Sequence, residues 1–396
     1  MAAGEKPYRV YRGGRTKGKV PLQRRVERDG RGPRSREPQR QVVRRPRQRW
    51  SWRRRIAVGA LVLVIVVLVW LVAGYFAVRG GVGDANKRLD QQAPDARAAL
   101  VSQNGLLMTS STNILLLGTD HSRNVPRSTD RHSDSIVLLR TDPGRHRLIY
   151  LSIPRDLRAA IPGHGDDKIN AAMQIGGPAL AIRTVESFTG LKINHVVVVD
   201  FGSFESLIDK IGGIDINVPE NILSNRFDCP YSTATRCQQW EGWRFHKGMN
   251  HMDGHRALIY SRIRENRLNP SDSDVTRGER QQQVLQAMMS KLAGFGTFVK
   301  LPFIGGDILK PISTDMSTWD FMQLAWVKFR ANGGSTLHCR LGGSFSSVGG
   351  ASTIIGTQEN ISVVQMVLGH SAPQPPPPGS GPAGPGCVVG SQSWPR

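Results

Sequence analysis

Asn113-Ile-Leu-Leu-Leu-Gly-Thr-Asp120 is an apolar run of strand length that ends in a charged residue. Further apolar runs of this length follow it along the chain, at 135–140, 147–153, 195–200 and 214–218. Nearly continuous runs of Val, Ile and Leu are typical of strands that are covered on both faces. These five segments therefore predict a sheet buried between layers of helices.

Helical periodicity separates the later strands. It predicts four helices, over residues 178–189, 201–211, 253–263 and 275–292. Strands that alternate with helices of about 10–15 residues indicate an α/β layered domain. We place this domain at 112–295 and expect 296–370 to be a C-terminal extension packed on it. Residues 371–396 are rich in Pro and Gly and predict a disordered tail.

The N-terminal region combines a basic segment with an apolar one. Residues 1–55 carry 20 Lys and Arg against 4 Asp and Glu, which is +16 of the formal net charge of +22. They contain few aliphatic residues, so we expect a disordered tail, which could bind nucleic acid, lie on anionic lipid or act as a topology signal. Residues 56–78 carry no charge, and a helix of this length is about 35 Å long, enough to cross a hydrocarbon core of about 30 Å.

A retained transmembrane helix explains these two segments better than a cleaved signal peptide. The apolar run is longer than the ~7–15 residues of a signal sequence, and a long segment precedes it. The positive-inside rule then places residues 1–55 in the cytoplasm. Residues 79–111 are polar with alanine patches and predict a stalk or a short packing helix. The domain that follows would be extracellular, attached to the cell membrane by a single pass.

Cysteines outside the membrane can form disulfides. Cys229 and Cys237 bracket a polar loop and predict one. A metal site is the weaker interpretation, because no second Cys/His pair stands at zinc-ligand spacing. Cys339 and Cys387 are the remaining pair, and the sequence leaves their bonding open. The stretch 221–250, polar and aromatic, is either a disulfide-pinned surface loop or a glycan contact.

The region 262–282 concentrates groups that bind anions. It contains Arg262, Arg264, Asp274, Arg277, Arg280, Gln281 and Gln282. Arginine presents planar, permanently charged donors that match phosphate oxygens. On a helix, Arg277, Arg280 and Gln281 share one face. The segment predicts a phosphate or pyrophosphate site, and a solvated basic helix is the alternative.

Charged residues also stand at the ends of the predicted strands. Asp120 follows the first strand, Asp134 precedes the second, and Arg155-Asp156 follows the third. Ligands of open α/β sheets bind beyond the carboxyl ends of strands. Two aspartates near arginines suit a magnesium ion bound to a phosphorylated substrate. Asp120 alone could equally cap a turn.

The order of these motifs resembles that of the LytR-CpsA-Psr family. The resemblance covers residues 113–290 and rests on Asn113–Asp120, Ser133–Ile136, Ser152–Asp156, Lys168–Ala171, Gly176-Gly177, Gly212–Asp215, Arg262–Arg264, Asp274, Arg277 and Arg280–Gln282. A cytoplasmic tail, one membrane span and an external domain are also the topology of that family. It implies a three-layer α/β/α sandwich with a mixed central sheet, preceded by one transmembrane helix.

The resemblance also implies an enzyme. Family members transfer a glycopolymer from a polyprenyl-pyrophosphate carrier to peptidoglycan and form a phosphodiester bond. Carried over residue by residue, the family pattern makes Asp120 and Asp134 ligands of Mg²⁺. The positions matching its pyrophosphate contacts are Arg155, Lys168, Arg262, Arg264, Arg277 and Gln281. We expect Arg155, Arg262 and Arg264 to act in catalysis, with Asp134 or Asp274 accepting the proton. The lipid tail is expected in an apolar pocket lined by the helices at 178–189 and 201–211.

Other functions remain as hypotheses. A non-catalytic wall-binding or scaffold protein would have the same anchor without the chemistry. A membrane-bound transcriptional regulator would use the basic tail to bind DNA. However, the sequence contains no helix-turn-helix or zinc pattern, and the domain would lie across the membrane from DNA. We therefore expect no nucleic-acid partner. Hydrolysis of the lipid pyrophosphate is a possible side activity.

Overall fold

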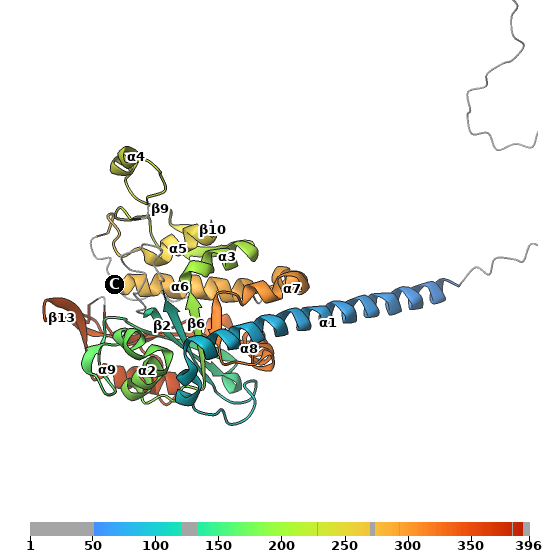
Figure 1. Ribbon diagram of the computed structural model, residues 1–396, viewed down its shortest axis with the longest axis horizontal. Coiled ribbons are helices and arrows are strands. Elements are labelled where there is room, and N and C mark those ends of the chain that lie inside the picture. Colours follow the sequence, from blue (N-terminus) through green and yellow to red (C-terminus); the bar gives the residue numbers. More distant parts are fainter. Residues whose placement is uncertain are drawn as a thin grey trace, which may run out of the picture. The chain divides into compact units, whose positions relative to one another are not determined.

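A seven-stranded mixed sheet forms the centre of the domain, in the order β11-β6-β1-β2-β3-β12-β15 (Figure 1). β1 is parallel to β6 and β3 is parallel to β12, while the other neighbouring pairs are antiparallel. Four of the five predicted apolar runs are in this sheet. The strands are β1 (Asn113–Thr119), β2 (Ser133–Asp142), β3 (Arg147–Ile153), β6 (His195–Asp200), β11 (Ile312–Thr314), β12 (Leu337–Arg340) and β15 (Gly386–Val389).

The structure is a computed structural model that describes residues 51–119, 133–227, 229–269, 274–292, 294–381 and 383–390. The predicted tail at 1–55 therefore lies almost wholly outside the described residues. The chain divides into two units, residues 1–58 and residues 59–396. The second unit contains every strand of the central sheet.

Helices cover both faces of the sheet, as the apolar runs predicted. Leu115 and Leu117 of β1 pack with α2 (Ala171–Thr189) and α9 (Glu359–Leu368). Ile114 and Leu116, which alternate with them along β1, pack instead with α8 (Thr318–Arg330) and with Val82 of α1 (Trp52–Gln92). Successive side chains of a strand point to opposite faces, so one strand supplies both layers. The domain is thus an α/β/α sandwich, and Figure 1 shows α2 and α9 on one side of the sheet and α6 (Asp274–Leu292) on the other.

A second hydrophobic cluster lies beside the main layers. It joins α3 (Phe201–Lys210), α5 (Gly254–Arg262), α6 and α7 (Phe295–Ile308) to a separate ribbon of β7 (Ile214–Val218) and β10 (Gly248–Met252). β7 is the fifth apolar run. Its side chains alternate between buried and exposed. This pattern suits a ribbon with one covered face, which is why β7 does not enter the central sheet.

Short elements complete the domain. The hairpin of β4 (Arg158–Ile161) and β5 (Gly165–Lys168) and the hairpin of β13 (Gly343–Val348) and β14 (Ala351–Gly356) project from the carboxyl ends of β3 and β12. The remaining elements are β8 (Ile222–Leu223), β9 (Arg244–Phe245), α4 (Ala234–Gln239), η1 (Pro94–Ala99), η3 (Pro143–Arg145) and η4 (Gly333–Ser335). The Cys229–Cys237 disulfide is present next to α4, as predicted.

The C-terminal region corrects the predicted domain boundaries. The prediction of a disordered tail from residue 371 was wrong for Gly386–Val389, which forms the edge strand β15. Cys387 lies opposite Cys339 in the β15–β12 pair, and a disulfide joins them. A short apolar strand can pair with the backbone N–H and C=O groups at the open edge of β12, even though the segment that precedes it is rich in proline. Since 296–370 supplies β11 and β12, it belongs to the sandwich and is not an extension packed on it.

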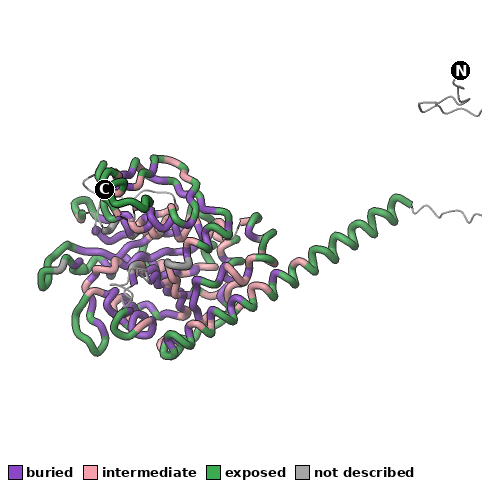
Figure 2. Tube along the Cα trace, turned by 45° about the horizontal axis from the view of Figure 1, so that its top comes forward, coloured by how far each residue is buried: buried purple, intermediate pink, exposed green. Residues whose placement is uncertain are grey.

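α1 is longer than the predicted transmembrane helix. It is the one described helix that is long and apolar enough to cross a membrane, and no part of its apolar window is buried. It continues through the predicted stalk, where Val82, Ala85 and Leu89 are buried in the domain. Figure 2 shows this change from exposed to buried along the helix. Part of the stalk is therefore a packed helix.

Candidate active site

A polar cavity lies where β3 and β12 end. It encloses about 130 Å³. Because β3 and β12 are parallel, their carboxyl ends open at the same edge of the sheet. The β4–β5 hairpin, α6 and the β13–β14 hairpin close the remaining sides. The lining includes Ser135, Ser152, Arg155, Asp156, Lys168, Arg277, Gln281, Arg340, Phe345 and Ser352.

Asp156 organises the cations of this cavity. Lys168 Nζ donates to its Oδ1 at 2.7 Å, and Arg155 Nε donates to its Oδ2 at 3.3 Å. Burial raises the pKa of the Asp156 carboxyl, but the hydrogen bond from Lys168 and the charges of Arg155, Lys168 and Arg277 outweigh burial and lower it below its usual value. Asp156 is therefore a stable anion that holds two cations beside each other.

α6 brings two more predicted residues into the cavity. Arg277 and Gln281 are four positions apart, so they share a face of the helix, as predicted. Arg277 is buried at 5% exposure. Arg280 is buried too, but its Nη1 donates to the carbonyl of Ile263 at 2.8 Å. Arg280 thus ties α6 to the end of α5 and is not among the residues that line the cavity.

Arg340 is a cavity residue that the sequence analysis missed. Only 4% of it is exposed, and its guanidinium donates to Glu279 at 2.9 Å and twice to the carbonyl of Gly384. Burial lowers the pKa of Arg340, and Glu279 opposes that effect. Arg340 ends the run Leu337–Arg340, just as Asp156 follows the third strand, but a run of four residues does not identify a strand by itself. Asp156 was noted in the sequence but received no role.

Arg262 and Arg264 are placed differently from the other predicted anion ligands. Arg262 is the last residue of α5 and is half-buried, while Arg264 is exposed. Neither is among the residues that line the polar cavity. The structure therefore brings Arg155, Lys168, Arg277 and Gln281 together, and the role of this arginine pair stays a prediction.

The predicted metal ligands lie at the edge of what the structure describes. Asp120 lies outside the described residues, and so do the side chains of Asp134 and Asp274. The backbone shows that Gly118 pairs with Ser135 and Thr119 with Ser133, so Asp134 is the extra residue of a β-bulge. Bulges often occur beside active sites, where they redirect a side chain. Among the described residues no group of three or more His, Cys, Asp or Glu could hold a metal ion.

An apolar cavity adjoins the polar one. Its lining includes Leu116, Val137, Val199, Phe204, Val284, Leu285 and Met288, together with Ser135 and Gln281, which also line the polar cavity. Of the two helices expected around an apolar pocket, α3 contributes Phe204. The expectation for residues 178–189 was wrong, because α2 packs on the other face of the sheet. The apolar cavity encloses about 40 Å³, so the paired cavities suit an anionic head and the first part of an apolar tail.

The chain also matches a protein-family model. Residues 75–365 match the LytR_cpsA_psr family. The chain belongs to the LytR-CpsA-Psr family. The match covers most of the domain, including β11, β12 and α8, which the sequence analysis had not assigned to the family pattern.

Similar proteins carry names from two functional classes. The polyisoprenyl-teichoic acid–peptidoglycan teichoic acid transferase TagU of Oceanobacillus iheyensis is 31% identical over 275 residues, which is 67% of this chain and 77% of that protein. The regulatory protein MsrR of Staphylococcus aureus is 32% identical over 206 residues, but the match covers only 52% of this chain and 56% of MsrR. The solved structure of TagT bound to LIIa-WTA has a TM-score of 0.53, with 26% identity over 68% of this chain and 93% of that chain.

Proposed function

We propose that this protein is a membrane-anchored phosphotransferase of cell wall assembly. Its donor is a glycopolymer carried on a polyprenyl pyrophosphate, and its acceptor is a hydroxyl group of peptidoglycan. The names of TagU and of the TagT complex support this class of reaction. The observation that carries the proposal is the pair of adjoining cavities, one cationic and one apolar, joined at Ser135 and Gln281.

The two cavities match the two ends of such a donor. Arg155, Lys168 and Arg277 offer fixed positive charge and N–H donors to pyrophosphate oxygens. The apolar side chains of α6 and of the sheet face the polyprenyl chain, whose burial stabilises the complex by roughly 25 cal/mol per Å² of apolar surface. A water-soluble phosphate ester would leave the apolar cavity without a role.

The reaction needs charge neutralisation more than covalent chemistry from the protein. The acceptor oxygen attacks the phosphorus that bears the glycan, and the bond from that phosphorus to the bridging oxygen breaks. Polyprenyl monophosphate leaves, and the acceptor proton passes to a carboxylate, for which Asp134 and Asp274 are the two candidates. Asp156 keeps Lys168 and Arg155 in position and is a positioning residue in this scheme.

We propose Mg²⁺ as the cofactor, with Asp120 and Asp134 as its protein ligands. Support comes from the chemistry of the donor set, since two carboxylates and phosphate oxygens suit this ion. When bound, the ion would neutralise charge on the pyrophosphate. Asp156, the described carboxylate of the cavity, already accepts from two cations and is the poorer candidate ligand.

The anchor fits a lipid-linked donor. We propose that the N-terminal tail is cytoplasmic, that α1 crosses the cell membrane once, and that the catalytic domain is extracellular. A carrier with a long polyprenyl chain stays in the bilayer, so an enzyme held at the surface meets it directly. Hydrolysis of the same pyrophosphate, with water in place of the acceptor hydroxyl, is the side activity that this site would permit.

The test uses the full chain in detergent with a polyprenyl-pyrophosphate-linked glycan and a soluble peptidoglycan oligosaccharide. Mass spectrometry follows the phosphodiester product and polyprenyl monophosphate, with and without a chelator. We expect both products, and we expect the chelator to stop their formation. If well-folded protein forms neither product and retains no lipid, the scaffold function becomes the better explanation. Activity that survives chelation would remove Mg²⁺ from the proposal and leave the transferase.

A further inference from the structure

α7 packs closely against the apolar part of α1. The indole Nε1 of Trp70 donates to the carbonyl of Val299 at 3.2 Å. Gly81 lies so near Gly306 that a Cβ on Gly81 would come within 2.9 Å of the Gly306 Cα. Small residues allow such close approach between helices in membranes. Residues 299–306 of α7 thus lie beside residues 70–81 of α1, which are the last part of the run that would cross the bilayer and the three residues after it.

α7 also carries apolar side chains that are exposed. Val299 and Phe303 are exposed, and Phe303 is 83% exposed. Their spacing of four puts them on one face of the helix. An exposed aromatic side chain beside a transmembrane helix is stable in an apolar environment. In water, its apolar surface would be hydrated at a cost in free energy.

α8 presents a second apolar face. Trp319, Met322, Trp326 and Phe329 recur at spacings of three and four and are all exposed, Phe329 at 78%. The opposite side of the helix, with Leu324 and Val327, is buried in the domain. The Trp326 and Phe329 rings stack with centroids 5.9 Å apart. This stripe is longer than the single exposed apolar residues that are normal on soluble surfaces.

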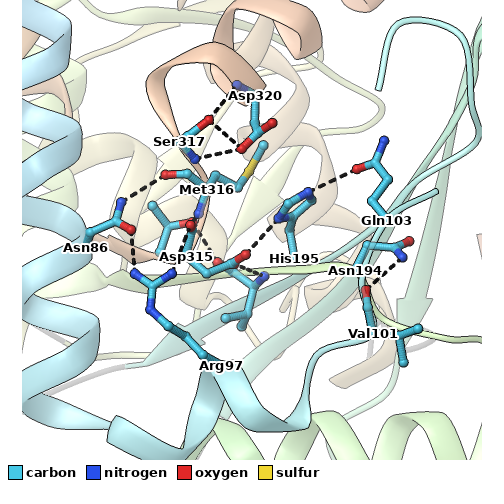
Figure 3. Close-up of polar contacts among 12 residues, drawn as sticks. Asn86, Arg97, Val101, Gln103, Asn194, His195, Asp315, Met316, Ser317 and Asp320 are labelled. Carbon is cyan, nitrogen blue, oxygen red and sulfur yellow. Dashed lines mark hydrogen bonds and ion pairs between the residues drawn. The ribbon is translucent and has the colours of Figure 1, made fainter. Parts of the chain in front are cut away.

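α8 begins beside the part of α1 that directly follows the apolar run. Val82 lies four positions after that run, about 6 Å along the helix, and is buried in the same cluster as Leu324 and Val327. Asn86 donates to the carbonyl of Met316 at 2.9 Å, and a capping box of Ser317 and Asp320 then starts α8. Figure 3 shows these contacts together.

A polar network fixes α1 to the domain around this point. Arg97 of η1 donates to Asn86 and to the carbonyl of Asp315. The Asp315 carboxylate in turn contacts the His195 ring at 2.7 Å and accepts from the Val196 amide (Figure 3). Because α1 is held by buried apolar side chains and by these hydrogen bonds, the direction in which it leaves the domain is set by the fold.

We propose that Val299 and Phe303 of α7 and Trp319, Met322, Trp326 and Phe329 of α8 form one membrane-binding face. This α7–α8 face lies in the lipid interface around the point where α1 leaves the bilayer. Its occupant is lipid, since α7 packs along the apolar part of α1 and three of the four exposed apolar side chains of the α8 stripe are aromatic. Trp and Phe with flanking Lys328 and Arg330 are typical of helices that lie 5–10 Å deep in the interface.

The face also brings the apolar cavity close to the bilayer. α6 lines the polar cavity with Gln281, lines the apolar cavity with Val284 and Met288, and leads directly into α7. If the proposed function holds, a polyprenyl chain would reach the apolar cavity along α6 without crossing water. The membrane contact itself depends only on α1 being the anchor, so the two proposals can fail separately.

Spin labels test the membrane contact. All four cysteines are in disulfides, so Phe303→Cys and Trp326→Cys each give one reactive thiol. Ile361→Cys is the matched control, because Ile361 is an exposed apolar residue on α9, on the other face of the sheet. The full chain is labelled and reconstituted into vesicles of phosphatidylglycerol and phosphatidylcholine. The accessibility of each spin label to two relaxants, oxygen and an aqueous nickel chelate, is then measured separately.

We expect the ratio of oxygen to nickel accessibility to be several-fold higher at positions 303 and 326 than at 361. High nickel accessibility at both positions would overturn the proposal, because the face would then be in water. Low accessibility to both relaxants, with an immobilised label, would also overturn it and would indicate a protein partner or a second copy. Since these side chains are exposed, the substitutions remove no core contact, and near-UV circular dichroism verifies the fold.

Discussion

Replacing Lys168 by methionine tests whether the cation group around Asp156 binds the pyrophosphate. Lys168 Nζ lies 2.7 Å from Asp156 Oδ1, and the two side chains are 28% and 17% exposed. The substitution keeps most of the side-chain length but removes the charge and all N–H donors. Asp156 then keeps the longer contact to Arg155, at 3.3 Å, and the nearby charge of Arg277.

The expected loss follows from the strength of one charged hydrogen bond. Such bonds contribute about 1.5–3 kcal/mol when they are shielded from solvent, as this pair largely is. At about 1.4 kcal/mol per factor of ten, kcat/KM for the lipid donor should fall roughly 10- to 100-fold. The pKa of Asp156 should also rise, because burial then acts against fewer opposing positive charges.

The assay compares kcat/KM of full-length Lys168→Met with that of wild type and of Lys192→Met. Lys192 is the matched control, since it is 70% exposed and lies 3.8 Å from Glu186, outside the cavity. A carbon-13 titration of the Asp156 carboxyl gives the second measurement. If Lys168→Met and Lys192→Met have the same kcat/KM, the assignment of the polar cavity to pyrophosphate is refuted, whatever the titration shows.

Three further predictions concern other parts of the molecule. Burial lowers the pKa of His338 to about 4. The unfolding free energy should therefore be highest above pH ~6.5 and should fall by roughly 3 kcal/mol as the pH decreases to and below 4. Urea unfolding at several pH values measures this dependence, and His338→Gln should make it weaker. Cys339→Ser opens a disulfide of sequence separation 48 and should cost about 4 kcal/mol of unfolding free energy, whereas an unchanged urea midpoint would mean that β15 is held by its other contacts. Arg262→Ala and Arg264→Ala should each abolish transfer with an intact circular dichroism spectrum, and normal activity in both would remove this pair from the site.

Much of the fold could be predicted because its strands and helices carry local signals. β1, β2, β3 and β6 are apolar runs with clear ends, and α6 has the periodicity of a helix with one apolar side. The strands from the last part of the chain lack such signals. β11 has three residues, and β12 and β15 have four each, too short for periodicity to separate them from loops. They form only because an existing sheet offers an open edge.

Some residues of the candidate site could likewise be predicted from the sequence, and others could not. Arg155 and Lys168 stand in recognisable motifs, and the offset between Arg277 and Gln281 follows from helical geometry alone. Arg340 comes from a strand that only tertiary pairing reveals, so its place in the cavity could not be seen from the motifs.

What the sequence by itself determined is the chemistry and its order along the chain: an apolar helix, buried strands, and arginines grouped for an anion. These depend on residue type and on spacings within one element, which local geometry sets. What only the tertiary structure decided is which distant groups meet. The Asp156 anion gathers Arg155 and Lys168, the apolar cavity adjoins the polar one, and α7 and α8 gather beside α1. Such contacts arise from packing between elements far apart in sequence, and no local pattern encodes them.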